Sequence, residues 1–405
     1  MGRVLPTRRI ALQVRGMNRA RIASTNRSRS ADLQVRGTIS VILWLTFALA
    51  VSASPVRDFF AHEVYGVLPP RPAKLLFELK ESGEAWEGLA LRRQYRIVSA
   101  DAKGTHAFAV LVYLPKDAEH AAPAFVYPNF SGNHSLVADE KVFVEEGPVF
   151  ANRRYARGGR ADRVSVKRIL ERGFAFVTYC YCSIYPDYAG TDRDAAPESV
   201  YAIFPEEKLT KPLLAHPAWS WGAMRVRDLL ETLPEINQGH VAIAGQSRMG
   251  KNAIITGVND DRFALVCANC GGTKSLKLLP NLRYPHWFAP GLRKYALNEK
   301  TGLPLAELEA VAAKMPDPPF DQADYLGLIA PRALSVGCSR EDKWSPPEAA
   351  LACVRKAEPY FARHGRTIGW HCKEGPHALT HEDWEHYLNY ALHTLGWKTL
   401  QGRTN

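Results

Sequence analysis

The chain has 405 residues, of which 46% are hydrophobic and 9 are tryptophan, a composition that predicts a folded globular protein of one large or two smaller domains and excludes a disordered one. Its formal net charge of +11 is unevenly spread: residues 1–53 hold nine arginines and a single acid, Asp32, so eight of the eleven net charges lie there. The rest of the chain carries little excess charge, and nucleic-acid binding is therefore not expected.

The N-terminal segment has the layout of an export signal. A basic stretch precedes the apolar run of residues 41–51, which is too short to span a bilayer comfortably, and the small residues Ser52, Ala53 and Ser54 follow. This layout predicts a basic leader and secretory signal over residues 1–53, with cleavage after Ala53. The mature protein is then expected to be secreted or periplasmic, with no stable membrane span. An uncleaved N-terminal anchor is the alternative.

Seven cysteines follow the predicted signal, and export would permit disulfides. Cys267 and Cys270 have the C-x-x-C spacing of half a zinc site, but no second pair with metal spacing follows them. We therefore expect no metal, and either buried cysteines or one or two disulfides.

Residues 54–100 are expected to form an N-terminal lead-in. From about residue 105 onward, strand-like and helix-like segments alternate. Strands are predicted at residues 106–114, 124–130, 174–181, 240–245, 264–268, 333–337 and 367–372, and helices at 219–233, 252–258, 348–364 and 381–395. This alternation predicts βαβ units, and hence an α/β protein whose mostly parallel central sheet is covered by helices on both faces. One catalytic domain is assigned to residues 101–400.

Residues 245–251 read Gly-Gln-Ser-Arg-Met-Gly-Lys and connect a predicted strand to a predicted helix. A serine at such a turn, usually within G-x-S-x-G, is the exposed nucleophile of α/β-hydrolases, whose fold is a three-layer sandwich. Here Met249 stands where the second glycine is expected, and Gly250 follows one residue later. Because an ordinary βα loop would give a similar pattern, the case for Ser247 depends on the rest of the chain.

An acid and then a histidine should follow the serine along the chain. Asp342 comes shortly after the strand predicted at 333–337, and Glu341 beside it is the second choice; both acids would also suit the cap of the helix that follows. His377 lies in a bent loop directly after the last predicted strand, whereas His381 and His386 fall on the next helix. We therefore predict His377 as the general base and Asp342 as the acid that orients it.

Acyl transfer also needs donors for the oxyanion. The backbone N–H of Arg248, directly after the nucleophile, is the expected donor, and the Arg248 side chain offers a second, charge-assisted hydrogen bond. Lys251 lies one helical turn after Ser247, where a cation suits a polar or anionic substrate. A lysine that merely faces solvent is the alternative.

Together these motifs resemble the glucuronoyl esterases, carbohydrate esterase family 15 of the α/β-hydrolase superfamily. The turn at Ser247 is similar to that family's G-x-S-R-x-G-K. The other similar motifs follow in the family's order across residues 105–396, at 129–134, 172–176, 187–188, 218–222, 284–288, 328–332, 341–344 and 377–384.

The resemblance implies a serine esterase that hydrolyses esters of glucuronic or 4-O-methyl-glucuronic acid, as in links between lignin and glucuronoxylan, without a metal or other cofactor. It implies Ser247 as nucleophile, His377 as base and Arg248 as oxyanion donor. It further implies that Lys251 binds the sugar hydroxyls and that Trp344 packs against the sugar. The expected partner is a carbohydrate ester such as glucuronoxylan or a related polysaccharide.

The chain departs from the family pattern at two places. Many members carry the catalytic glutamate shortly after the elbow helix, where residues 269–272 read Asn-Cys-Gly-Gly, so the acid here has to be Asp342. The segment between Gly272 and Tyr284 is also shorter than usual, and the family's Gln and Glu contacts to the sugar have no counterpart that the sequence identifies. Two alternatives stay open: a serine carbohydrate esterase for acetyl-xylan or uronate methyl esters, and a catalytically silent hydrolase-fold binding protein.

Overall fold

The computed structural model describes residues 54–116, 120–188, 194–279, 286–296 and 304–399. The leader and signal predicted over residues 1–53 lie outside these residues. No helix within the described ranges has both the length and the apolar character that a membrane span requires.

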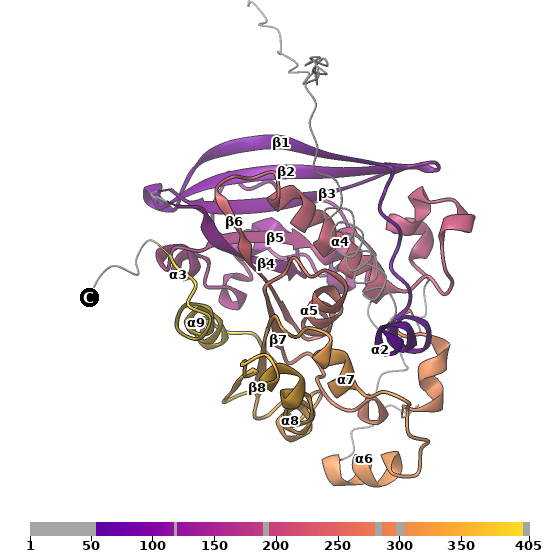
Figure 1. Ribbon diagram of the computed structural model, residues 1–405. Helices are drawn as coiled ribbons and strands as arrows, with labels where there is room; N and C mark the ends of the chain where they lie inside the picture. Colours follow the sequence, from indigo (N-terminus) through magenta and orange to yellow (C-terminus); the bar gives the residue numbers. More distant parts are fainter. Residues whose placement is uncertain (1–53, 117–119, 189–193, 280–285, 297–303, 400–405) are drawn as a thin grey trace, which may run out of the picture. The chain divides into compact units, whose positions relative to one another are not determined.

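In the described residues, nine strands form one sheet in the order β1-β2-β3-β5-β4-β6-β7-β8-β9 (Figure 1). Strands β5, β4, β6, β7, β8 and β9 pair in parallel, whereas β1, β2 and β3 pair antiparallel. The strands are β1 (Lys74–Ala85), β2 (Ala90–Asp101), β3 (Gly104–Pro115), β4 (Ala122–Asn129), β5 (Ala175–Cys180), β6 (Ile236–Gln246), β7 (Leu265–Asn269), β8 (Ala333–Ser339) and β9 (Gly369–Lys373).

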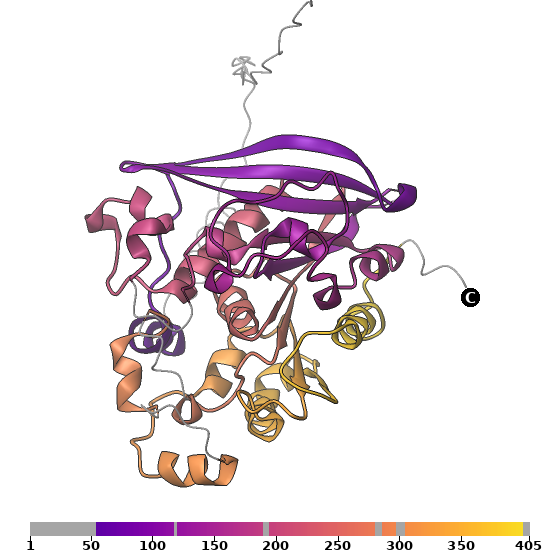
Figure 2. The ribbon, with the colours of Figure 1, turned by 180° about the vertical axis from the view of Figure 1, so that it is seen from behind.

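Helices cover both faces of the sheet, and each face has its own hydrophobic core. On one face α4, α5 and α8 contribute to a core with buried tryptophans such as Trp219; on the other, α3 and α9 pack with Trp384 (Figures 1 and 2). The α-helices are α2 (Pro55–Phe59), α3 (Val166–Glu171), α4 (Ala215–Leu230), α5 (Arg248–Asn259), α6 (Leu305–Ala312), α7 (Gln322–Gly327), α8 (Pro347–Ala362) and α9 (His381–Asn389). The predicted α/β-hydrolase three-layer sandwich is confirmed.

Every strand and helix predicted between residues 106 and 395 is present, with ends shifted by a few residues. Strands β1 and β2 were not predicted, because their charged residues interrupt the apolar alternation; they extend the sheet from within the segment expected to be a lead-in. All seven cysteines lie in described residues as free thiols, six of them buried, so the expectation of buried cysteines is confirmed.

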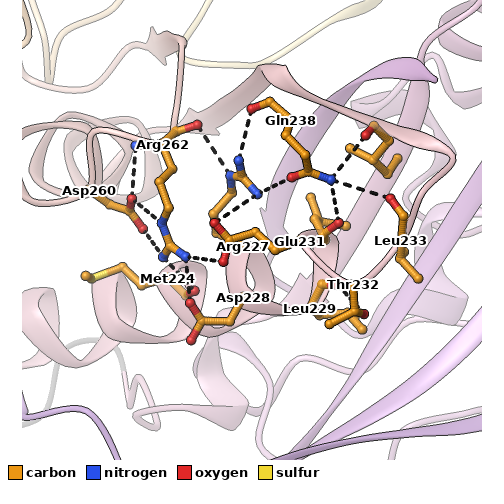
Figure 3. A network of polar contacts seen from close by, with 12 residues as sticks. Met224, Arg227, Asp228, Leu229, Glu231, Thr232, Leu233, Gln238, Asp260 and Arg262 are labelled. Carbon is orange, nitrogen blue, oxygen red and sulfur yellow. Dashed lines mark hydrogen bonds and ion pairs between the residues drawn. The ribbon is translucent and has the colours of Figure 1, made fainter. Parts of the chain in front are cut away.

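A polar network ties α4 to the start of β6 and to the turn between α5 and β7 (Figure 3). Arg227 on α4 donates to the side chain of Gln238 at 2.6 Å. In the turn, Arg262 binds Asp260 at 2.6 Å and reaches Asp228 on α4 at 2.7 Å. The network fixes α4 against the strand and helix that flank the candidate nucleophile.

Candidate active site

Ser247 lies at the sharp turn between β6 and α5. Its backbone has φ 59° and ψ −125°, a strained left-handed conformation for a residue with a side chain, and its N–H donates to the carbonyl of Asn269 on β7 at 2.8 Å. A Cβ at position 245 would collide with the carbonyl oxygen of Met249. The turn therefore has the strand–turn–helix geometry that a nucleophile elbow requires.

Packing explains why the second glycine of the motif stands at position 250 and not at position 249. Met249 is fully buried in the core beneath α5, so this position takes a large side chain instead of the usual glycine. At position 250, by contrast, a Cβ would lie 2.6 Å from the carbonyl oxygen of Asn269, where β7 passes close to the helix. The close approach of α5 to β7 occurs at Gly250, so the glycine is needed one residue later than in the usual motif.

The predicted acid and base are in direct contact. His377, in the loop after β9, places its Nδ1 2.7 Å from Oδ2 of Asp342, which follows β8. The other oxygen, Oδ1, accepts the backbone N–H groups of Trp344 at 2.8 Å and Ser345 at 3.0 Å. Burial alone would raise the pKa of Asp342, but the His377 hydrogen bond and these N–H groups bring it below its ordinary value. Asp342 is thus held as a carboxylate facing the imidazole.

The other candidates for the acid and the base do not make this contact. Glu341 is exposed, and its backbone, rather than its carboxylate, holds the His377 loop, through an N–H donated to Gly375 at 3.1 Å. His381 is exposed at the first position of α9, and His386 stacks on His371 with ring centroids 4.1 Å apart. Neither of these two histidines lines the cavities that contain Ser247.

Arg248 is the first residue of α5, so its backbone N–H lies at the positive end of the helix dipole. Its guanidinium lies 4.4 Å from the ring centroids of both Phe150 and Trp287. Nη1 binds the buried carboxylate of Asp187 at 2.5 Å, and Tyr181 donates to the same oxygen at 2.8 Å. These contacts therefore hold the Arg248 side chain in one position beside Ser247.

Two cavities meet at Ser247, Arg248 and His377, which line both of them. The first, about 450 Å³, also includes Lys251 and the exposed ring of Trp344, the two residues predicted to contact sugar. The second, about 960 Å³, is lined further by aromatic rings and by three arginines, Arg153, Arg160 and Arg163. Ser247 thus lies where the two cavities join.

The sulfur of Cys270 lies beside Asp342 and His377. Ligand atoms of Cys270, Asp342 and His377 lie within 4.8 Å of one another. Burial raises the pKa of the Cys270 thiol to about 12, so at neutral pH it is protonated, and metal ions bind the thiolate. The hydrogen bond between His377 Nδ1 and Asp342 Oδ2 also engages one ligand atom of each remaining residue, and two backbone N–H groups engage the other oxygen of Asp342. The group therefore fits a packed thiol beside a hydrogen-bonded pair better than a metal site.

A second buried network supports the loop that carries His377. Asp383, at the start of α9, accepts hydrogen bonds from Asn269 at 2.7 Å and from the backbone N–H of Thr380 at 2.7 Å, and contacts His371 Nε2 at 2.6 Å. Lys373 pairs with Asp383 at 3.2 Å and donates to the carbonyl of Ala378 at 2.7 Å, one residue after His377. The network joins β7, β9 and α9 directly beneath the imidazole.

The sequence reasoning missed some residues of the site. Asp187, the partner of Arg248, was noticed only as part of a motif, although it lies in the loop that follows β5, where parallel sheets place functional side chains. Lys274, which lines the first cavity, comes five residues after the end of β7 and carries no motif that would identify it. Both follow the carboxyl ends of strands, and this is the signal that could have found them.

The chain is similar to known esterases along most of its length. A family model described as fungal glucuronyl esterase matches residues 160–365, just over half of the chain. A solved glucuronoyl esterase from Solibacter usitatus is 30% identical, with a TM-score of 0.73 over 85% of this chain and 92% of that one.

Carbohydrate esterase MZ0003, from an unknown prokaryotic organism, is 27% identical over 381 residues, which cover 84% of this chain and 83% of the relative. The 4-O-methyl-glucuronoyl methylesterase 1 of Phanerochaete chrysosporium (strain RP-78 / ATCC MYA-4764 / FGSC 9002) is 28% identical over 167 residues, 36% of this chain and 32% of that one. The chain belongs to the glucuronoyl esterase family.

Proposed function

We propose that the protein hydrolyses esters of glucuronic or 4-O-methyl-glucuronic acid, such as those that link lignin to glucuronoxylan, with Ser247, His377 and Asp342 as its catalytic triad. Membership of the family and the names of its fungal relatives support the substrate class. The observation that carries the assignment of the residues is the 2.7 Å contact between Asp342 and His377, because His377 also lines the cavity that contains the strained Ser247.

In the first step, the Ser247 hydroxyl attacks the C6 carbonyl of the uronate and gives its proton to Nε2 of His377. Asp342 holds the other ring nitrogen, which fixes the tautomer and stabilises the imidazolium that forms. The tetrahedral intermediate then collapses, His377 protonates the departing alcohol, and the uronoyl group remains on Ser247 as an ester. In the second step, water attacks this ester with His377 again as base, releasing the uronic acid and free Ser247.

The negative charge of the tetrahedral intermediate develops next to Arg248. Its backbone N–H at the first turn of α5 supplies one hydrogen bond, and its clamped guanidinium supplies a second, charge-assisted one. Because Asp187 and the rings of Phe150 and Trp287 already hold the guanidinium, it needs little reorganisation as the negative charge forms. We assign sugar binding to Lys251 and to the exposed ring of Trp344 in the first cavity.

We also propose that the protein is exported, since its expected polysaccharide substrates lie outside the cell. The apolar run at residues 41–51 and the small residues before Pro55 support this proposal.

The direct test is hydrolysis of benzyl D-glucuronate by the purified protein, beside Ser247→Ala and His377→Ala variants. We expect turnover by the wild type and losses of several orders of magnitude in kcat for both variants. If the wild type cleaves p-nitrophenyl acetate through Ser247 but leaves the glucuronate ester intact, the protein is a serine esterase of another specificity. Activity that survives in Ser247→Ala would refute the proposed nucleophile.

A further inference from the structure

Among the described residues, the first cavity is lined by three cationic side chains and by no acidic one. Arg248, Lys251 and Lys274 all line it, and its other lining residues are neutral or, in the case of His377, already paired. Asp187 balances the charge of Arg248. For the two lysines, no carboxylate of the described residues lies within 4 Å of either ammonium. Neither lysine therefore forms an ion pair within the described residues, and the nearest carboxylate that acts on Lys274 is that of Asp342.

Both lysines are buried, with 7% of Lys251 and 3% of Lys274 exposed. The ammonium of Lys274 donates to the carbonyl of Trp344 at 3.1 Å, which leaves two of its three N–H groups for other partners. A side chain at position 272 would have its Cβ 3.1 Å from Nζ of Lys251, so Gly272 keeps space open around that ammonium. Both cations are thus positioned to donate into the cavity.

Burial and the nearby Lys274 lower the pKa of Lys251 to about 7, and burial lowers the pKa of Lys274 to about 8. Burying a cation without a counter-ion is unfavourable, and a bound anion would remove that cost. The ester at Ser247 cannot supply this anion, because its carboxyl group is neutral while it is esterified. Lys251 also lies four residues after Ser247, about 6 Å further along α5, so its partner is a different part of the substrate.

We propose that this esterase acts on uronate esters that carry a second, negatively charged oxygen group, and that Lys274, together with Lys251, binds that group. The charged group is either the free carboxylate of a neighbouring uronic acid or a sulfate ester on the sugar. The inference rests on the proposed function, since it concerns the substrate of the same serine, and it makes Lys274 a specificity-determining residue.

The test compares three methyl esters at constant ionic strength: methyl D-glucuronate, its 2-sulfate, and the monomethyl ester of a diuronic acid whose second carboxylate is free. We expect kcat/KM to be about tenfold higher for at least one charged ester, as a charge-assisted hydrogen bond would give. Lys274→Met should remove that preference. Lys343→Met, which deletes an exposed charge on the loop of Trp344 outside the cavity, should keep it. The preferred charged ester identifies the carboxylate or the sulfate as the ligand.

Binding of the charged acids is measured separately by calorimetry in buffers of different ionisation enthalpy. At pH 8 we expect proton uptake on binding, because an anion raises the pKa of both lysines, and reduced uptake in Lys274→Met. Equal kcat/KM for neutral and charged esters, or an unchanged preference in Lys274→Met, would overturn the inference while leaving the esterase intact. If no uronate ester is hydrolysed, the proposed function fails, and the calorimetric measurement still decides whether Lys274 binds an anion.

Discussion

At the scale of single residues, two neighbouring acids have opposite surroundings. Asp342 is buried against His377, while Glu341 next to it is exposed. We expect Asp342→Asn to lower kcat by about 10⁴-fold, because an amide at this position favours the wrong imidazole tautomer. Glu341→Gln is the matched control and should retain kcat within about twofold, as an exposed charge that does not contact the imidazole. The measurement is steady-state hydrolysis of benzyl D-glucuronate; equal losses in both variants would contradict the assignment of Asp342.

The sequence could predict Ser247, Asp342 and His377 as candidates because each follows a recognisable strand and because serine, acid and base come in the order of the fold. It could not identify Lys274 or the pairing of Arg248 with Asp187. These contacts join segments far apart in the chain, and a lone lysine or aspartate in a loop looks like any solvated charge. Their significance depends on burial, which only the packed structure reveals.

At the scale of elements, the loop with His377 depends on the first turn of α9. Asp383 is fully buried and receives hydrogen bonds from three different segments. We expect Asp383→Asn to lower the free energy of unfolding by about 3–5 kcal/mol, because it leaves the buried ammonium of Lys373 without its carboxylate. Urea unfolding measures this loss. Glu382→Gln, the exposed neighbour in the same turn, should change it by less than about 1 kcal/mol.

The difference in the free energy of unfolding between wild type and Asp383→Asn should decrease at low pH. Burial would raise the pKa of Asp383, but the hydrogen bond with His371 and the charge of Lys373 bring it below its ordinary value. Its stabilising contribution is therefore present above the unfolded pKa of about 3.9 and is lost as the pH falls through the lower folded pKa. The gap between wild type and Asp383→Asn should shrink in strongly acidic buffer. A gap that widens there would contradict this account of the network.

The sequence predicts strands best where they are fully buried, because a buried strand reads as a short apolar run. All residues of β4, β5, β7 and β8 are buried, and their short apolar runs identified them. Strand β1 lies at the edge of the sheet with most of its side chains at least partly exposed, and its charged residues hide the alternation. The antiparallel extension of the sheet through β1 and β2 follows from pairing between strands, which no local pattern encodes.

At the scale of the whole catalytic unit, the elbow is held by packing that lies far from the chemistry. Helix α4 packs against α5, and the network in Figure 3 joins α4 to both ends of the β6–α5 segment. Asp228, 4% exposed, connects this network to a further buried arginine, since it pairs with Arg262 at 2.7 Å and with Arg225 at 2.7 Å. The stability of the fold around Ser247 should therefore be sensitive to this one carboxylate.

We expect Asp228→Asn to lower the free energy of unfolding by about 3–5 kcal/mol, because the guanidinium of Arg225 is buried and loses its counter-ion. The folded variant should keep the wild-type kcat on benzyl D-glucuronate, since Asp228 lines neither cavity at Ser247. Glu231→Gln removes the half-exposed partner of the same Arg262 and should cost less than about 1 kcal/mol. Urea unfolding of the three proteins measures the effect on stability. The value of kcat, measured at urea concentrations below the unfolding transition, gives the effect on catalysis separately. If Asp228→Asn were as stable as Glu231→Gln, the buried pair would not support the elbow; if it were stable but inactive, Asp228 would act on the site itself and not on the fold.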